Sequence, residues 1–340
     1  MDKILKVGIV GMGRMGITHY SIINAHENVK IISVADTTSV IVSMLKKYLS
    51  GVDVYKDYKD LILKSKPDAI LVCTPPNLHN EILELAAENN IHVFVEKPYT
   101  VNYKETVKLA EIFKAKNLVN QVGYVNRFND VFHFVKELIN KNVIGDIIRF
   151  KSEMFSATII KKDDGSGWRG SHASGGGVIY EMASHSIDLI NFFLGKPKNV
   201  IGTRANKIFS KNVEDIVSST IEYENGAIGT IYVNWSDTSY RKPTNKVELF
   251  GTNGKIVADQ HSLKIFLNNP NEEYNYIKGW NTVYITDIFR SVPFYVRGNE
   301  FTRQLFDFAD LCLEKRDEQV CSFEDGADTQ FVINEMYNQI

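Results

Sequence analysis

The feature that most constrains this chain is the alternation of short apolar runs with helical stretches between Val7 and Val122. The apolar runs have the length and composition of buried strands, and they lie at Val7–Val10, Val29–Ala35, Ala69–Thr74, Ile91–Val95 and Leu118–Val122. Helical periodicity fills the intervals at Thr18–Ala25, Ser39–Tyr48, Leu78–Asn89 and Tyr103–Lys116. Because consecutive parallel strands need right-handed crossover connections, the pattern predicts a doubly wound α/β sheet.

The pattern changes after Tyr124. Helices are expected at 127–140 and 178–193, with a strand at 147–155 between them. Further strands are expected at Val200–Asn206, Ile216–Tyr223, Ala227–Trp235, Lys246–Phe250, Lys255–Ala258 and Leu263–Leu267. Two junctions carry Asn-Gly, which is typical of hairpins, and a helix at 300–313 precedes a tail expected to form another. The sequence therefore predicts an α/β domain at residues 1–123 and a mainly antiparallel α+β domain at residues 124–340.

Composition excludes several classes of protein. The length of 340 residues suggests two domains at about 150 residues each, and 44% hydrophobic residues exclude a disordered chain. The 39 Lys and Arg nearly balance the 41 Asp and Glu, so no strong field favours nucleic acid or an anionic membrane. No apolar run approaches the ~18 residues of a membrane span, and the amino terminus does not resemble a signal peptide. Three cysteines without a CxxC pair fit a reducing compartment, so we expect a cytoplasmic protein.

A glycine-rich sequence follows the first predicted strand and opens a helix: Gly11, Met12, Gly13, Arg14, Met15 and Gly16. It fits the G-x-G-x-x-G dinucleotide fingerprint, because the next predicted strand ends at Asp36, 20 residues after Gly16. Gly11 allows a tight turn, Gly13 lets the backbone approach a pyrophosphate, and Gly16 lets helix and strand pack closely. Asp36 is expected to bind the adenosine ribose and to repel a 2′-phosphate, which favours NAD(H) over NADP(H). The alternative is a glycine turn that only packs a strand against a helix.

A second polar turn follows the strand predicted at Ala69–Thr74, and it contains Thr74, Pro75, Asn77 and His79. Ligands of doubly wound sheets bind beyond the carboxyl ends of the strands, so we expect this turn to border the cofactor. In the alternative interpretation, the prolines only end the strand and start the next helix, and His79 is structural. Both interpretations can hold together.

The strand predicted at Ile91–Val95 ends on Glu96, Lys97 and Pro98. A Lys at this sheet edge faces the same crevice as the predicted cofactor. Its ammonium group can stabilise the alkoxide that forms when a substrate hydroxyl is oxidised. Lys97 is therefore the first catalytic candidate, and Glu96 and Lys97 are both expected to border the cofactor. A surface ion pair between the two is the alternative.

The helix predicted after the Gly175–Gly177 triplet carries a polar stripe. Glu181, His185 and Asp188 stand at i, i+4 and i+7, which places them on one helix face. His185 is the best candidate for a general base, since an imidazole titrates near neutral pH, and Glu181 can orient its ring or relay the proton. The alternatives are a solvated helix face or a zinc site, and the zinc site lacks an evident fourth ligand.

The segment from Lys161 to His172 is expected to form a loop over the mouth of the cleft. Trp168 offers an apolar platform for a sugar ring or a base, and Arg169 offers a bidentate partner for a phosphate or carboxylate. Further candidates to line a substrate pocket are Tyr124, Arg127, Tyr180 and His185.

These motifs together resemble the glucose–fructose oxidoreductase, inositol dehydrogenase and rhizopine catabolism (Gfo/Idh/MocA) family. The resemblance is carried by Gly11–Gly16, the Thr74-Pro75-Pro76 turn with His79, Glu96-Lys97-Pro98, and Gly175–Gly177 with His185 and Asp188. It implies an amino-terminal Rossmann domain, a second domain on a large, open, mainly antiparallel sheet, and a homodimer or homotetramer. Family members often place an Arg near Arg169 in contact with substrate, and commonly have Asp where this chain has Glu181.

The resemblance implies an oxidoreductase that transfers a hydride between NAD(H) and a secondary hydroxyl of a sugar. His185 is expected to take the hydroxyl proton while Lys97 stabilises the oxyanion, and no metal is expected. Arg169 and the basic loop favour a nucleotide-linked hexose as substrate. The alternatives are a free sugar or inositol dehydrogenase, a glycoside hydrolase that uses NAD transiently, and a non-catalytic dinucleotide-binding regulator. The presence of both Lys97 and His185 argues against the regulator.

Overall fold

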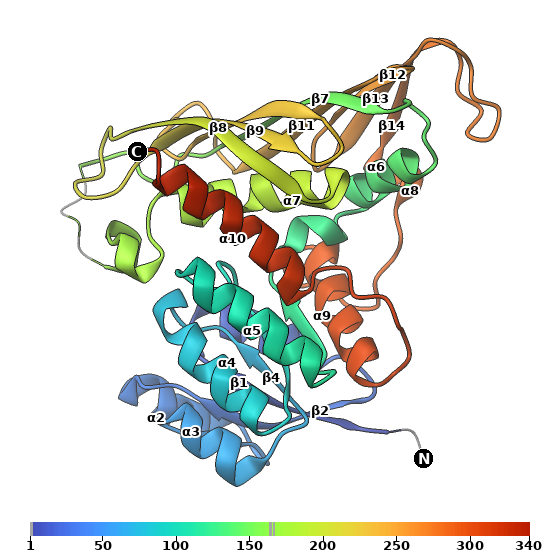
Figure 1. Ribbon diagram of the computed structural model, residues 1–340. Coiled ribbons are helices and arrows are strands. Elements are labelled where there is room, and N and C mark those ends of the chain that lie inside the picture. Colours follow the sequence, from blue (N-terminus) through green and yellow to red (C-terminus); the bar gives the residue numbers. More distant parts are fainter. Residues whose placement is uncertain (1–2, 163–164, 166) are drawn as a thin grey trace. The chain divides into compact units, whose positions relative to one another are not determined.

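The computed structural model describes residues 3–162, 165 and 167–340. The chain divides into two compact units (Figure 1). Unit 1 comprises Met1–Val125 and Ser291–Ala327, and unit 2 comprises Asn126–Arg290 and Asp328–Ile340. Each unit is built on its own sheet.

Unit 1 contains a parallel sheet of six strands in the order β3-β2-β1-β4-β5-β6. The strands are β1 (Leu5–Val10), β2 (Val29–Ala35), β3 (Asp53–Tyr55), β4 (Ala69–Val72), β5 (His92–Val95) and β6 (Asn120–Val122). This is the strand order of a doubly wound dinucleotide-binding fold, with the change of direction between β1 and β4. The predicted fold class is confirmed, and β3 is the strand that the sequence analysis missed.

Helices connect these strands. They are α1 (Arg14–Ile23), α2 (Ser39–Tyr48), α3 (Tyr58–Asp60), η1 (Leu61–Ser65), η2 (Pro76–Leu78), α4 (His79–Glu88) and α5 (Tyr103–Ala115). The start of α5 is fixed by Asn102, whose side chain accepts from the backbone N–H groups of Lys104 and Glu105. Helices α4 and α5 pack side by side (Figure 1).

The helix α9 (Asn299–Cys312) belongs to unit 1, which differs from the predicted domain boundary. Its apolar face, with Leu305, Phe308 and Cys312, joins the buried cluster that contains Ile9 and Phe94. The segment Ser291–Ala327 therefore returns to the first sheet, although the sequence analysis assigned everything after residue 123 to the second domain. The change of period near residue 123 marks where the chain leaves unit 1, but it carries no information about a later return.

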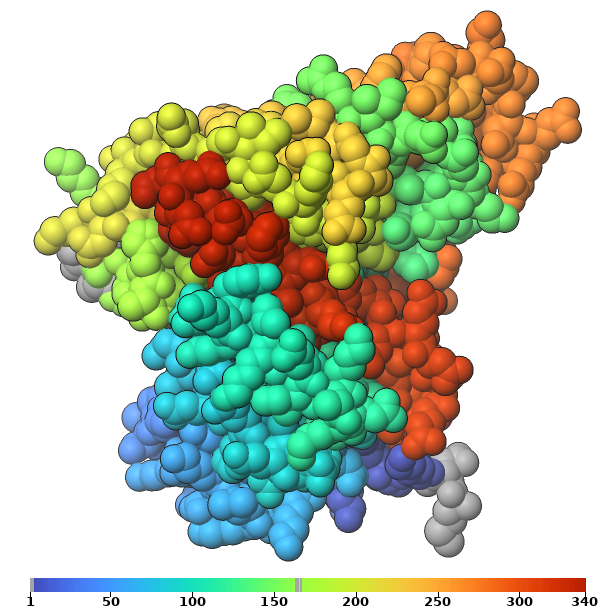
Figure 2. Space-filling model, in the orientation of Figure 1, coloured from blue at the N-terminus to red at the C-terminus, as the bar shows by residue number. Residues whose placement is uncertain are grey.

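Unit 2 contains a sheet of eight strands in the order β14-β13-β12-β11-β7-β10-β9-β8. They are β7 (Ile147–Phe155), β8 (Pro197–Asn206), β9 (Ile216–Tyr223), β10 (Ile228–Asn234), β11 (Thr244–Gly251), β12 (Gly254–Ala258), β13 (Ser262–Leu267) and β14 (Gly279–Tyr284). Within the described residues of this second sheet, only the β7–β10 pair is parallel. The prediction of a mainly antiparallel sheet is confirmed, and β14 was missed. The chain between β13 and β14 (orange) lies on the surface (Figure 2).

Helices cover one face of this second sheet. They are η3 (Val125–Phe128), α6 (Asp130–Asn140), η6 (Ile179–Ala183), α7 (Ser184–Leu194) and α8 (Ile285–Ile288), and the division between units falls within α10 (Phe323–Tyr337). In Figure 1, α6 and α7 lie along the same face, and α7 contacts β7 while α6 contacts β12 and β13. Along β7, Phe150, Ser152 and Met154 are buried, whereas Lys151 on the opposite face is exposed. Within the described residues, the longest and most apolar helices still fall short of what crossing a membrane requires.

Candidate active site

The glycine loop in unit 1 has the packing that a dinucleotide site requires. Gly11 has a φ of +90°, and a Cβ there would stand 2.8 Å from the Cys73 carbonyl carbon. A Cβ on Gly16 would overlap the Gly11 carbonyl oxygen, whereas a Cβ on Gly13 would meet nothing within 4 Å. Gly11 and Gly16 are thus required by the fold itself. The open space at Gly13 is what the close approach of a pyrophosphate needs.

Asp36 fixes the loop from the end of β2. Its Oδ2 accepts from the Met12 backbone N–H at 2.8 Å, and its Oδ1 accepts from the Thr38 N–H at 2.8 Å. The helix α1 begins after Gly13 without a side-chain cap, so its first N–H groups are suited to bind an anion. Arg14 is exposed and Met15 is half-buried at this helix start. The residues present therefore fit the adenosine and diphosphate parts of NAD.

His79 joins two loops at the same sheet edge. Its ring is fully buried, with Nε2 at 2.9 Å from the Thr74 carbonyl oxygen and Nδ1 at 3.0 Å from the Tyr99 carbonyl oxygen. Burial lowers the pKa of His79, although its bonds to backbone carbonyls act in the opposite direction. His79 thus shapes the turn on which Pro75 and Asn77 are exposed. Direct contact of the turn with a cofactor remains a prediction.

Lys97 follows β5 as predicted, and its backbone is held by the preceding residue. The Lys97 N–H donates to Glu96 Oε2 at 3.2 Å, and Glu96 Oε1 lies 2.6 Å from Nε2 of His19 on α1. Burial raises the pKa of the Glu96 carboxyl, but the His19 hydrogen bond and the nearby positive charges more than offset this and leave the pKa below its ordinary value. Tyr124, two residues after the end of β6, is buried.

Sequence reasoning missed His19. The available signal was its position on α1, three residues after Gly16, on the side of the helix that faces the strands. A histidine on the strand-facing side of a helix can simply pack there as a buried aromatic ring. Its residue type alone therefore did not reveal that Glu96 is its partner.

In unit 2, the helix with the catalytic candidates begins as a π-turn. The turn η6 carries Glu181 and continues into α7, which carries His185, and both side chains are partly exposed. Asp188, which the sequence analysis placed on the same stripe, is fully buried instead. A π-turn adds a residue to the helical repeat and is frequent at functional sites. The accessible polar face is therefore formed by Glu181 and His185 without Asp188.

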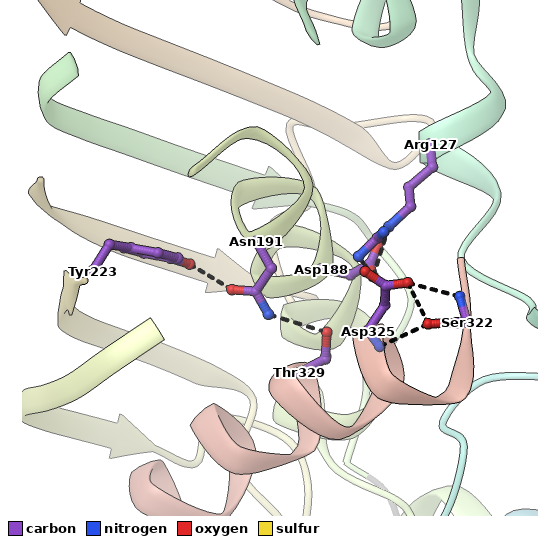
Figure 3. A network of polar contacts seen from close by, with 7 residues as sticks. All are labelled: Arg127, Asp188, Asn191, Tyr223, Ser322, Asp325 and Thr329. Atoms are coloured by element: carbon purple, nitrogen blue, oxygen red, sulfur yellow. Dashed lines mark hydrogen bonds and ion pairs between the residues drawn. The ribbon is translucent and has the colours of Figure 1, made fainter. Parts of the chain in front are cut away.

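Asp188 pairs with Arg127 inside unit 2 (Figure 3). Arg127 Nη2 lies 2.8 Å from Asp188 Oδ1, and Arg127 Nε lies 3.0 Å from Asp188 Oδ2. Arg127 is only 2% exposed. Figure 3 also shows Asn191, one turn further along α7, between Tyr223 and Thr329. These buried contacts assign Arg127 to holding α7, and its predicted contact with substrate has no support from its position.

Trp168 and Arg169 lie together on the short turn η4 (Trp168–Gly170), which is followed by η5 (His172–Ser174). The Arg169 guanidinium stacks 4.7 Å from the centre of the Trp168 ring, and its Nη2 lies 3.2 Å from Glu181 Oε1. The structure thus brings three predicted site residues into contact. Asp163, Asp164 and Ser166 of the predicted loop lie outside the described residues.

Glu214 is a second residue that sequence reasoning missed. Its Oε1 accepts from the Ile179 backbone N–H at 2.9 Å and from the Tyr337 hydroxyl at 3.1 Å. Gly177 has a φ of +99°, and a Cβ there would overlap Glu214 Oε1. Tyr180 is buried with its ring 5.3 Å from that of Tyr337. Glu214 therefore anchors the start of η6, and no local motif signals such a long-range partner.

The parallel sheet with its glycine loop, together with a second domain that carries acid–base side chains, defines a two-domain dinucleotide-dependent oxidoreductase. Residues 5–124 match the oxidoreductase family with an NAD-binding Rossmann fold, and residues 132–257 match the GFO/IDH/MocA C-terminal domain. The chain belongs to the GFO/IDH/MocA family. It is accordingly an NAD-dependent oxidoreductase, as the sequence analysis predicted.

Individual proteins of known name are similar to this chain. Myo-inositol 2-dehydrogenase of Thermotoga maritima is 24% identical over 265 residues, which cover 75% of each protein. The 2,7-anhydro-N-acetylneuraminate hydratase of Escherichia coli is 27% identical over 261 residues, or 75% of this chain and 68% of that protein. Levoglucosan dehydrogenase, solved in complex with NADH, has a TM-score of 0.85 at 20% identity, covering 99% of this chain and 97% of its own.

Proposed function

We propose that this protein is a dehydrogenase that interconverts a secondary hydroxyl and a ketone on a sugar-like polyol. The observation that carries the proposal is the 2.6 Å contact between His19 and Glu96, which ties the helix of the glycine loop directly to the turn of Lys97. The ammonium group of Lys97, which this turn carries, is of the type suited to stabilise an oxyanion. NAD, when bound, supplies the hydride acceptor.

The proton chemistry is assigned to side chains of both units. His185 removes the proton from the substrate hydroxyl, since an imidazole nitrogen can serve as a general base and the side chain is partly exposed. Lys97 stabilises the negative charge that develops on that oxygen. Glu181, which pairs with Arg169, sets the charge around His185 and is itself a candidate for relaying the proton.

The test is NADH formation in the presence of a panel of polyols, followed by single variants. We expect Lys97→Ala to lower kcat by about 10²- to 10³-fold, the loss seen when one oxyanion donor is removed. The affinity for NAD should change little, because the glycine loop is untouched. Lys104→Ala, at an exposed position on α5, is the control. A Lys97→Ala enzyme with wild-type turnover would falsify the assignment.

The charge environment of Arg169 bears on whether the substrate is an uncharged sugar or a nucleotide-linked sugar. The sequence analysis favoured a nucleotide-linked hexose because a free Arg can bind a phosphate. In the structure Glu181 faces Arg169 and offsets its charge, which favours an uncharged sugar or cyclitol. The Arg169 side chain is nevertheless 42% exposed, so its remaining donors keep the nucleotide-linked hexose as the competing prediction. Arg169→Gln separates them: it should leave KM for an uncharged polyol nearly unchanged, but raise KM for a nucleotide-linked hexose about tenfold or more.

A second candidate is a reaction in which NAD is reduced and reoxidised within one turnover. It is favoured by the similarity to a relative named as a hydratase. Bond cleavage or water transfer without net NADH would indicate this reaction or the glycoside hydrolase considered above. NAD binding without any conversion would indicate the regulator.

We also propose that the protein is a cytoplasmic homodimer or homotetramer that associates through the uncovered face of the second sheet. Aromatic side chains line a cavity of about 370 Å³ on this face, formed with Phe250, Phe266 and Trp280. Beside it, Lys255 pairs with Glu248 at 2.7 Å. Light scattering should detect a dimer or larger species, and Trp280→Glu should weaken it. A monomeric wild-type protein contradicts this proposal.

A further inference from the structure

We propose that His19 is a positioning residue for Lys97, acting through the carboxylate of Glu96. The inference rests on the proposed function, in which Lys97 is the cation at the reacting oxygen. His19 is fully buried on α1, and it touches the Lys97 turn only through Glu96 in the contacts described above.

Each oxygen of the Glu96 carboxylate has a hydrogen-bond partner. Oε1 bonds His19 at 2.6 Å, and Oε2 accepts the Lys97 N–H at 3.2 Å. Gly123 closes a third side, because a Cβ there would stand 3.2 Å from Oε2 and 3.3 Å from the Glu96 Cα. A carboxylate packed in this way cannot turn without breaking one of the two bonds. The orientation of the Lys97 backbone therefore depends on the bond to His19.

The surroundings of His19 determine where its proton lies. The ring makes an edge contact with Phe94 at 5.2 Å and a tilted contact with Phe301 at 6.4 Å. Within the described part of the chain, its Nδ1 is buried without a hydrogen-bond partner. A proton on Nδ1 alone would leave a buried N–H unsatisfied and set two lone pairs against each other at Glu96. The proton therefore lies on Nε2, and His19 is the donor to Glu96.

This pair connects the two parts of the cofactor half of the site. The helix α1 begins at the glycine loop, and Lys97 begins the turn after β5. A side-chain bond thus links the helix that is expected to receive the dinucleotide to the turn that carries Lys97. Removing the outer partners of metal ligands typically costs about 10- to 100-fold in activity, and we expect a loss of this order when His19 is removed.

The experiment compares three variants of the full-length protein. His19→Phe keeps the ring volume and removes the donor, whereas His19→Gln returns an N–H donor of similar reach. His26→Phe is the matched control, because His26 is also a buried histidine of unit 1 that contacts a carboxylate, Asp310 at 3.3 Å, away from Lys97. If a variant does not fold, Glu96→Gln replaces it, since this change weakens the same link from the other side.

On the best substrate of the wild-type enzyme, His19→Phe should lower kcat by about 10- to 100-fold with KM and NAD affinity within about threefold. His19→Gln should recover most of the loss, and His26→Phe should show none. Removing His19 also removes a group that lowers the pKa of Glu96, so the acidic limb of the kcat profile should move to higher pH only in the His19 variants.

A second readout needs no substrate. Hydrogen exchange at the Lys97 amide should accelerate in His19→Phe, return toward the wild-type rate in His19→Gln, and stay unchanged in His26→Phe. Unchanged exchange, or a lower melting temperature with unchanged kcat and pH profile, overturns the inference. A wild-type protein that turns over no substrate refutes the proposed function instead, and the exchange data then decide whether His19 positions Lys97.

Discussion

At the residue scale, the carboxylates in and around the candidate site are held by specific partners. Asp188 receives a bidentate Arg127, Glu96 has a hydrogen bond at each oxygen, and Asp36 accepts two backbone N–H groups. Asp188 is fully buried, and since a buried charge without a partner is strongly destabilising, its pairing with Arg127 fixes α7. Asp307 is also buried, and its carboxylate pairs with Arg316.

Asp307 should make stability depend on pH. Burial raises the pKa of its carboxyl from 3.8 to about 6, although the nearby Arg316 acts in the opposite direction. Because the folded state binds the proton more tightly than the unfolded chain, this contribution to stability is full below pH 3.8 and is lost as the pH rises to about 6.

Asp307→Asn removes this titration. The difference in unfolding free energy from urea titrations, variant minus wild type, should therefore increase from pH 4 to pH 6 and level off above, by about 1.4 kcal/mol per unit of pKa shift. A difference that decreases with pH over this window contradicts a pKa of Asp307 raised by burial. Asp317→Asn, on an exposed segment, is the control.

At the element scale, the regular strands and helices followed from the sequence because their periodicity is local. The bounds predicted for β2, α2, β7 and β9 agree with the structure. The strand β3 has three residues, and β14 carries an exposed Trp280, so neither shows a buried strand pattern. The π-turn η6 was unpredictable for another reason, since it depends on Glu214, which is distant in sequence.

Those parts of the candidate site that depend on local sequence motifs could be predicted. The glycine loop, Asp36 and the position of Lys97 after β5 followed from strand ends and spacing. The roles of His19, Glu214 and Asp188 did not, because each depends on a partner from another element. The pairing of Arg127 with Asp188 was not foreseen for the same reason, and the contact of Arg127 with substrate stays a prediction.

The glycine loop makes a prediction that separates folding from binding. Gly13 has a φ of −71° and open space where an added methyl group would lie, so Gly13→Ala should fold normally. It should nevertheless weaken NAD binding by about tenfold or more, because the methyl group occupies the approach of the pyrophosphate. Gly16→Ala should instead destabilise unit 1, since its Cβ would overlap the Gly11 carbonyl oxygen.

These two variants are compared by melting temperature and by NADH fluorescence titration. Equal melting temperatures for wild type and Gly13→Ala, with reduced NADH affinity, support the assignment of the loop. If Gly13→Ala binds NADH as tightly as the wild type does, the dinucleotide does not bind at this loop and the assignment is contradicted.

At the scale of the whole molecule, the candidate residues for cofactor binding and for substrate chemistry are divided between the two units. Unit 1 has the dinucleotide loop and Lys97, and unit 2 has Glu181, His185, Trp168 and Arg169. The family assignment covers both units, since its two domain matches fall at 5–124 and 132–257. The central claim of the proposed function is that Lys97 and His185 act on the same substrate oxygen.

The most direct test of this claim is a double-mutant cycle on kcat/KM for NADH formation. It uses the wild type, Lys97→Ala, His185→Ala and the double variant, with NAD affinity measured for each as a check on folding. Groups that act on one reacting oxygen are strongly non-additive. We predict that the double variant is no more than a few-fold slower than the slower single variant. Losses that multiply would show that Lys97 and His185 act independently, and would contradict the claim.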